Sequence, residues 1–230
     1  MVFAYDFPHK KTQDFLFHLK VKGYHVRLVL GAPKRKLNIP PSSIRSKIRH
    51  QGLLHPADIA DAFGYCYEVI NHNDRRVPLL LREYQVELGI IAGARILNSH
   101  VIQSVPQGII NFHPGLIPEA RGLDAVLWSI LEDVPLGVTA HCIDERVDAG
   151  SILLKRTIPI YSDDTLLDLT ERVYEFQLEM LDEAIALAIA GKGELVQYAG
   201  PYHRKMPPEL EKQVLEKVSD YVARYAAEGA

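Results

Sequence analysis

The chain has 230 residues, of which 47% are hydrophobic and 24% charged, and its formal net charge is -3 at pH 7. This length suits one α/β domain, or one domain with a small appendage, and the charge identifies no class of partner. No apolar stretch is long enough to cross a membrane, and the first residues lack the basic segment of a secretion signal. We therefore expect a cytoplasmic protein with no membrane partner.

Both cysteines, Cys66 and Cys142, lie in apolar runs of the sequence. A free cysteine in such surroundings usually behaves as a small buried hydrophobic residue. We expect two buried, reduced thiols, and neither a disulfide nor a metal site.

Strand-like and helix-like segments alternate through the first half of the chain. Short apolar runs bounded by turn residues indicate strands, and apolar residues spaced three and four apart indicate helices. This alternation is typical of a parallel sheet covered by helices on both faces. We expect strands over 2–5, 25–31, 65–70, 88–93 and a segment that ends at 113, separated by helices over 12–20, 56–63, 77–84 and 100–105.

The second half predicts a helix over 123–131, two strands over 136–143 and 151–160 that form a hairpin, and a long helix over 164–190. The tail contains an amphipathic helix over 209–225. The fold class we predict is α/β: a Rossmann-like, mostly parallel sheet flanked by helices, with a small C-terminal helical appendage. Residues 1–190 would form the catalytic domain. Residues 191–230 would form a loop and a helix that packs on this domain or pairs two copies in a homodimer.

A long irregular stretch, residues 32–57, contains no acidic residue and several basic ones. Such a loop is either a solvated surface or a contact for an anionic substrate. The same two readings apply to His9, Lys10 and Lys11 at the start of the first helix, where a phosphate could bind. The basic residues of the stretch are Lys34, Arg35, Lys36, Arg45, Lys47 and Arg49.

Asn111 and His113 end an apolar strand, and Pro114 stops it. Because side chains alternate along a strand, both leave its end on the same face. The carboxyl edge of a parallel sheet is where α/β proteins bind ligands. The pair therefore places a hydrogen-bond donor and a titratable base at a candidate active site.

Asp148 is the third candidate, in a charged turn after the next strand, and adjacent parallel strand edges would bring it alongside the pair. A carboxylate stabilises a protonated imidazole, and an amide N–H stabilises an oxyanion. With no Ser or Cys nucleophile beside these groups, the nucleophile would come from a substrate. An amine that attacks an acyl carbon fits this arrangement.

Two strings around these residues resemble the ordered signatures of the folate-dependent formyltransferases. The first is Asn111-Phe112-His113-Pro114-Gly115-Leu116-Ile117-Pro118 followed by Arg121-Gly122. The second runs from Gly137-Val138-Thr139-Ala140-His141 through Ile143-Asp144-Glu145 and Val147-Asp148 to Gly150 and Ile152-Leu153. The resemblance covers residues 85–190 well and the first 80 residues only in outline.

The resemblance implies a site in which Asn111, His113 and Asp148 are catalytic and 10-formyltetrahydrofolate is the formyl donor. His141 matches a histidine common in the family, and is equally well explained as a structural residue. By the same resemblance, the donor would bind at Gly93, Ala94, Arg95, Ile96, Leu97, Ile143, Asp144, Glu145 and Val147. The acceptor would contact Gly115, Leu116, Ile117, Pro118, Arg121 and Lys10.

Departures from the family pattern narrow the range of candidate acceptors. Gly115 stands where the family often has Ser. The family's Gly-Ser-Asn phosphate loop is missing near residues 5–12, and this absence argues against glycinamide ribonucleotide as the acceptor. The tail leaves no room for the second domain of the tRNA enzyme, which argues against a nucleic-acid partner. We expect a small primary amine that is phosphorylated or nucleotide-linked, with amino-sugar nucleotides as the leading class. Another family acceptor, hydrolysis of the donor, and a non-catalytic folate-binding module remain alternatives.

Overall fold

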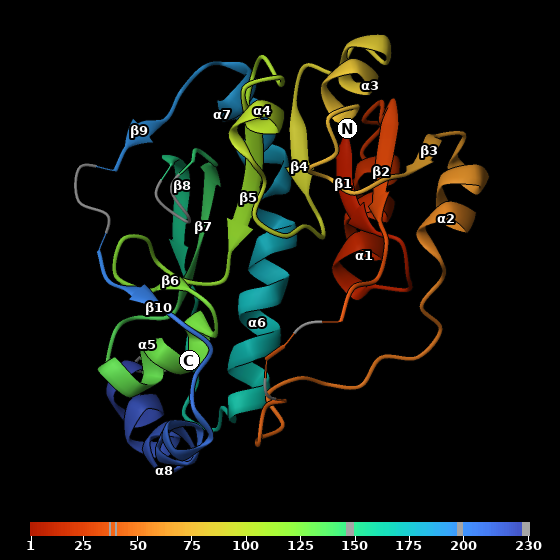
Figure 1. Ribbon diagram of the computed structural model, residues 1–230. Coiled ribbons are helices and arrows are strands. Elements are labelled where there is room, and N and C mark those ends of the chain that lie inside the picture. Colours follow the sequence, from red (N-terminus) through yellow and green to blue (C-terminus); the bar gives the residue numbers. More distant parts are fainter. Residues whose placement is uncertain (37, 40, 146–149, 197–199, 227–230) are drawn as a thin grey trace.

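The computed structural model describes residues 1–36, 38–39, 41–145, 150–196 and 200–226, and its centre is an eight-stranded sheet (Figure 1). The strand order is β3-β2-β1-β4-β5-β7-β8-β9. Neighbouring strands from β3 to β5 are parallel, whereas β7, β8 and β9 each pair antiparallel with the strand before them in that order. The predicted α/β class is confirmed. The strands are β1 Val2–Tyr5, β2 Leu28–Ala32, β3 Cys66–Val69, β4 Gly89–Ile91, β5 Ile109–His113, β7 Gly137–Cys142, β8 Ser151–Thr157 and β9 Glu194–Leu195.

Helices cover both faces of this sheet because its strands are apolar on both sides. On one face, β5 presents Ile110 and Phe112 to a core shared with α1, α2, α6 and α7. On the other face, Phe3 and Ile109 pack against α3 and α4. The bounds are α1 Lys10–Val21, α2 Pro56–Phe63, α3 Val77–Glu83, α4 Ser99–Ile102, α6 Leu166–Glu179 and α7 Leu181–Ile189.

The C-terminal helix α8 (Pro208–Tyr225) packs against α5 (Ala125–Glu132) at one end of the sheet (Figure 1). Val214 and Val222 are buried in this contact, and the Tyr221 hydroxyl donates to the Val134 carbonyl at 2.7 Å. Most of the apolar stripe of the tail helix is therefore covered by its own chain, and Leu215 stays exposed. A homodimer through this helix stays a prediction, as does a domain boundary at residue 190.

A second, two-stranded sheet ties the tail to the turn after β5. β6 (Arg121–Gly122) pairs parallel with β10 (Tyr202–His203). Gly122 has φ +98°, and a Cβ added there would lie 2.1 Å from the His203 carbonyl oxygen. Only glycine fits this close approach of two backbones.

Three expectations about the elements are wrong in detail. β7 runs antiparallel to β5, because the segment between them, which holds α5, stays at one end of the sheet and does not cross a face back to the start of β5 (Figure 1). Cys66 is exposed because β3 is an edge strand, and Cys142 is half-buried. The helix expected over 164–190 is two helices that meet at the buried Met180.

The stretch that follows β2 holds no helix or strand among its described residues up to His55, as its composition indicates. Figure 1 shows it as a long connection that passes beside the lower end of α6 before it reaches α2. Across the described part of the chain, no helix combines the length and the apolar character needed to span a bilayer. The location of the protein in the cell stays a prediction.

Candidate functional site

Asn111 and His113 leave β5 on the face opposite Ile110 and Phe112, as the strand period predicts. Both line one cavity. The His113 ring is 3% exposed, and its Nε2 donates to the Ala120 carbonyl at 2.6 Å. This hydrogen bond fixes the direction in which the ring points.

The antiparallel register places His141 directly opposite Asn111. Cross-strand neighbours on one face are close enough to interact, and Asn111 Nδ2 lies 3.2 Å from His141 Nε2. An amide nitrogen only donates, so this ring nitrogen of His141 is the acceptor. The amide keeps a second N–H and its oxygen for other partners.

The cavity beside this pair, which we call the Asn111 cavity, has a volume of about 260 Å³. It brings together most of the residues predicted to bind the donor. Gly93 lies behind the wall, where a Cβ would come 2.8 Å from the Tyr5 ring, and Val147 and Asp148 lie outside the described residues. The lining residues are Ile91, Ala94, Arg95, Ile96, Leu97, Asn111, His113, Gly122, Leu123, Ile143, Asp144 and Glu145.

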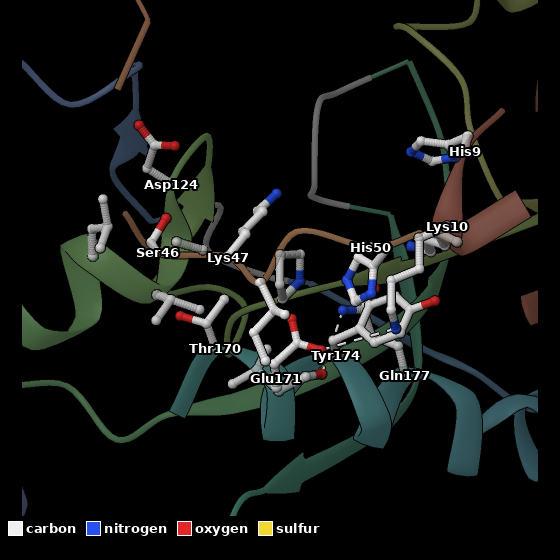
Figure 2. Close-up of a pocket in the computed structure, with 17 residues that line it drawn as sticks. His9, Lys10, Ser46, Lys47, His50, Asp124, Thr170, Glu171, Tyr174 and Gln177 are labelled. Atoms are coloured by element: carbon white, nitrogen blue, oxygen red, sulfur yellow. Dashed lines mark hydrogen bonds and ion pairs between the residues drawn. The ribbon is translucent and has the colours of Figure 1, made fainter. Parts of the chain in front are cut away.

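A larger cavity of about 470 Å³, the Lys11 cavity, lies next to the end of β5 (Figure 2). Its lining joins segments that are far apart in the sequence: the start of α1, the basic loop, the start of α5 and one side of α6. Pro114, the residue after His113, belongs to it. The lining residues are His9, Lys10, Lys11, Ser46, Lys47, Ile48, His50, Pro114, Asp124, Ala125, Val126, Leu127, Thr170, Glu171, Val173, Tyr174 and Gln177.

Positive groups converge in the Lys11 cavity. Lys11 Nζ donates to the Phe112 carbonyl at 3.1 Å, within the strand that carries Asn111 and His113. Burial, and then repulsion from Lys47, lower the pKa of Lys11 to about 7. Burial and the ammonium groups of Lys11 and Lys47 lower the pKa of His9 to about 4. The cations are therefore close enough to destabilise one another.

Lys10 also lines this cavity, but acidic groups compensate its charge. Its Nζ lies 3.1 Å from Asp14 Oδ2 and 4.0 Å from Glu171 Oε2, and it sits 3.4 Å from the centre of the Tyr174 ring. Lys10, a predicted acceptor contact, thus lies in the cavity with its charge compensated. The positive charge of the cavity comes mainly from Lys11 and Lys47.

The turn after Pro114, the other predicted acceptor contact, is absent from the lining of both cavities. A Cβ at Gly115 would lie 2.7 Å from the Ala120 carbonyl oxygen, so the turn is too tight for a serine there. Leu116 packs at Gly137, and buried Ile117 donates its N–H to Thr139 at 3.0 Å. The Arg121 guanidinium donates to the Gly200 carbonyl at 3.0 Å, and a Cβ at Gly200 would lie 1.9 Å from the Pro118 carbonyl oxygen. The turn therefore packs against β7 on one side and against the tail on the other.

Sequence reasoning missed the α6 side of the Lys11 cavity. Thr170, Glu171, Tyr174 and Gln177 share one side of that helix and carry no local motif. The available signal was their spacing of three and four residues, which places them on a common polar side of an amphipathic helix.

The family model described as "Formyl transferase" matches residues 25–185. The chain belongs to the formyl transferase family. This confirms the family that the two sequence strings predict. The matched segment contains Asn111, His113 and the Asn111 cavity, and it leaves out His9, Lys10 and Lys11 at the start of α1.

Curated relatives are similar over part of their length. The trifunctional purine biosynthetic protein adenosine-3 of Homo sapiens is 31% identical over 148 residues, which are 60% of this chain and 15% of that protein. The methionyl-tRNA formyltransferase of Prochlorococcus marinus is 25% identical over 210 residues, 90% of this chain and 62% of that enzyme. The chain thus spans less than two thirds of the length of these relatives.

Solved structures share the fold. Glycinamide ribonucleotide transformylase 1 from Symbiobacterium toebii has a TM-score of 0.63 at 21% identity, over 85% of this chain and 93% of that one. A sugar N-formyltransferase from a Shewanella species has a TM-score of 0.62 at 21% identity, over 99% and 88%. The formyltransferase PseJ from Anoxybacillus kamchatkensis, solved with a UDP-linked formamido sugar and tetrahydrofolate, has a TM-score of 0.57 at 23% identity, over 89% and 100%.

Proposed function

We propose that this formyl transferase family member transfers the formyl group of 10-formyltetrahydrofolate to the primary amine of a small, phosphate-bearing acceptor. One observation carries the proposal: two cavities lie beside the end of β5 and are lined by consecutive residues of the chain. His113 lines the Asn111 cavity, and Pro114, the next residue, lines the Lys11 cavity. A donor and an acceptor bound in these two cavities would meet beside Asn111 and His113.

The Asn111 cavity suits the donor. Ile91, Leu97 and Ile143 offer apolar surface to a flat pterin ring, and the adjoining backbone offers donors and acceptors to its edge. The PseJ structure, which shares this fold, was solved with tetrahydrofolate.

The Lys11 cavity suits an anionic acceptor. Burial, and after it the positive groups nearby, lower the pKa values of Lys11 and His9, and a bound phosphate would favour the protonated form of Lys11. An amino-sugar nucleotide carries a diphosphate that would lie against Lys11 and Lys47. Sugar formyltransferases of similar fold support this class, and glycinamide ribonucleotide formyltransferases share the fold to the same degree, so the choice of an amino-sugar nucleotide rests on its diphosphate.

In the mechanism we propose, the acceptor amine attacks the formyl carbon, and a negatively charged oxygen develops in the tetrahedral intermediate. The free N–H of the Asn111 amide donates to that oxygen. The carbon–N10 bond of the donor then breaks. The proton lost by the amine passes through His113 to N10, giving tetrahydrofolate and the formamide. Asp148 would stabilise the protonated imidazole.

The test is a formylation assay with 10-formyltetrahydrofolate and three acceptors: a UDP-linked 4-amino sugar, glycinamide ribonucleotide and charged initiator tRNA. We expect tetrahydrofolate and a formylated sugar nucleotide. Asn111→Ala should reduce turnover about 10² to 10³ fold, the typical cost of losing one oxyanion donor. Formate release without an amine would indicate a hydrolase. Tetrahydrofolate binding without any turnover would indicate a binding module.

A further inference from the structure

A buried carboxylate of the tail helix is bonded to the basic loop. Glu211, in α8, is 1% exposed. It accepts from Ser42 Oγ at 2.7 Å and from both the N–H and the hydroxyl of Ser43 at 2.5 Å. Although burial alone would raise it, the hydrogen bonds from Ser43 and Ser42 lower the pKa of Glu211 to about 2. The carboxylate therefore stays ionised at any pH at which the protein would be assayed.

Lys205 extends this contact to the start of α5. Its ammonium lies 3.1 Å from Glu211 Oε1 and 2.8 Å from Asp124 Oδ2, and the backbone N–H of Met206 donates to the same Asp124 oxygen at 2.8 Å. Asp124 has φ +53°, a left-handed conformation that is costly for a side chain with a Cβ. The tail contacts hold Asp124 in that conformation.

The two ends of this chain of contacts lie at two walls of the Lys11 cavity. Asp124 lines one wall. Ser46 and Lys47, which follow Ser43 along the loop, line another. Figure 2 shows Asp124 and Lys47 among the residues that line the cavity, on segments from different parts of the chain. The spacing between these walls therefore depends on Glu211 and Lys205.

A buried ionic network of this kind is a costly way to achieve stability alone. Apolar side chains of similar size often stabilise a fold as well or better, because charges lose hydration when they are buried. What a fully bonded network does supply is one defined geometry. The loop around Ser42 and Ser43 has no helix or strand to define its position among its described residues, so these bonds set it.

We propose that Glu211 and Lys205 are positioning residues for acceptor recognition, which fix the Lys47 wall of the Lys11 cavity relative to its Asp124 wall. The inference rests on the proposed function in one respect, that the Lys11 cavity holds the acceptor. It assigns a role in acceptor recognition to the C-terminal segment, which lies beyond the residues matched by the family model.

Limited trypsin digestion of the whole chain tests the positioning itself. Arg45 and Lys47 are exposed, and trypsin cleaves after them faster when the segment around them is released from the tail and can extend into its active site, so the rate follows the population of the released loop. Glu211→Gln should speed this cleavage about tenfold, because the charged hydrogen bonds that tie Ser42 and Ser43 to the tail are lost. The control is Glu216→Gln, an exposed carboxylate of the same helix, which should digest like the wild type. The double variant Ser42→Ala/Ser43→Ala, which keeps Glu211, should also be cut faster.

Ligand affinity tests the consequence for recognition. We use pyrophosphate as the probe of the Lys11 cavity and tetrahydrofolate as the probe of the Asn111 cavity, both by titration calorimetry. Glu211→Gln and Lys205→Met should weaken pyrophosphate binding about five- to tenfold and leave tetrahydrofolate binding unchanged, which also shows that the variants are folded. In the formylation assay, KM for the acceptor should rise while KM for the donor does not.

The outcomes separate this inference from the proposed function. If the wild type neither binds pyrophosphate nor transfers a formyl group, the proposed function fails, and the digestion rates still decide whether Glu211 holds the loop. If Glu211→Gln and Glu216→Gln digest alike, the positioning role is overturned. If the loop opens but pyrophosphate binds with unchanged affinity, the network is structural only, and the role in recognition is overturned.

Discussion

The orientation of the Asn111 amide depends on His141, its partner across β5 and β7. One amide N–H is committed to His141 Nε2, so the other is held in a defined direction. A preorganised donor is worth far more to a reaction than one that must first rotate into place. This hydrogen bond favours a positioning role for His141, which its place in the family string alone left open.

We predict that His141→Ala lowers kcat about tenfold with little change in KM for the donor, because the amide can then rotate away from the oxyanion. His141→Gln, whose side-chain oxygen can accept the same N–H, should recover part of the loss. The measurement is steady-state formylation, with a melting curve for each variant. Equal kcat in the wild type and His141→Ala would refute the assignment.

The pKa of Lys11 predicts how the binding of an anionic acceptor depends on pH. Its pKa of about 7 means that the ammonium loses its proton just above neutral pH. An anion binds the protonated form, so affinity is full below the pKa and falls as pH rises through it. His9, whose pKa is about 4, stays neutral over this range.

We expect KM for a UDP-linked amino sugar to rise about tenfold between pH 6 and pH 8.5, as one charge-assisted hydrogen bond is lost. The diphosphate of this acceptor is ionised throughout that range. Lys11→Met should have a high KM at every pH and no such rise, whereas Lys20→Met, an exposed lysine of the same helix, should follow the wild type. A rise that persists in Lys11→Met would assign the effect to another group.

At the scale of elements, the sequence predicts the order of the helices and of the longer strands, because each carries its own apolar period, whereas the two-residue strands β6, β9 and β10 are too short to show one. Pro56–Phe63 is found as predicted. The direction of a strand cannot be predicted in this way, because it depends on where the chain re-enters the sheet and not on the local pattern of residues. The antiparallel β7 illustrates this: the parallel direction expected for it is wrong, yet the start of the turn that follows it, Ile143–Glu145, lines the Asn111 cavity.

The first turn of α6 has a complete capping box. The Thr165 hydroxyl accepts from the Asp168 N–H, and the Asp168 carboxylate accepts from the Thr165 N–H at 2.8 Å. These bonds satisfy donors that the helix itself leaves open. They also secure the helix that carries Glu171 and Tyr174 into the Lys11 cavity.

We predict that Thr165→Ala lowers the free energy of unfolding by about 1 kcal/mol, the usual cost of losing such a cap. Thr165→Ser, which keeps the hydroxyl, should lose much less. Urea denaturation followed by circular dichroism gives both values. No difference between the two variants would show that the hydroxyl contributes nothing to the stability of this helix.

At the scale of the whole molecule, the two cavities are built from separate parts of the chain. The Asn111 cavity comes from short segments that follow β4, β5 and β7, so a sequence string can reveal it. The Lys11 cavity joins α1, the basic loop, α5 and α6, and no string spans these segments. The sequence therefore predicts most of the lining of the Asn111 cavity, whereas most of the lining of the Lys11 cavity comes together only in the fold.

Because the cavities share no lining residue, we predict that their binding energies are additive. Ile96→Ala should raise KM for the donor alone, and Lys47→Ala should raise KM for the acceptor alone. The double variant should show the product of the two effects within about 0.5 kcal/mol. A larger deviation in steady-state kinetics would reveal coupling between the cavities.

The bonds from Glu211 to Ser42 and Ser43 have a consequence for exchanging parts between related chains. A chimera that receives a foreign loop between β2 and α2 would face a buried carboxylate with no matching hydroxyls. One that receives a foreign tail would leave two serines without their anion. The loop and the tail lie about 170 residues apart in the sequence but form one structural unit. A chimera designed to transfer acceptor preference therefore has to exchange both segments together.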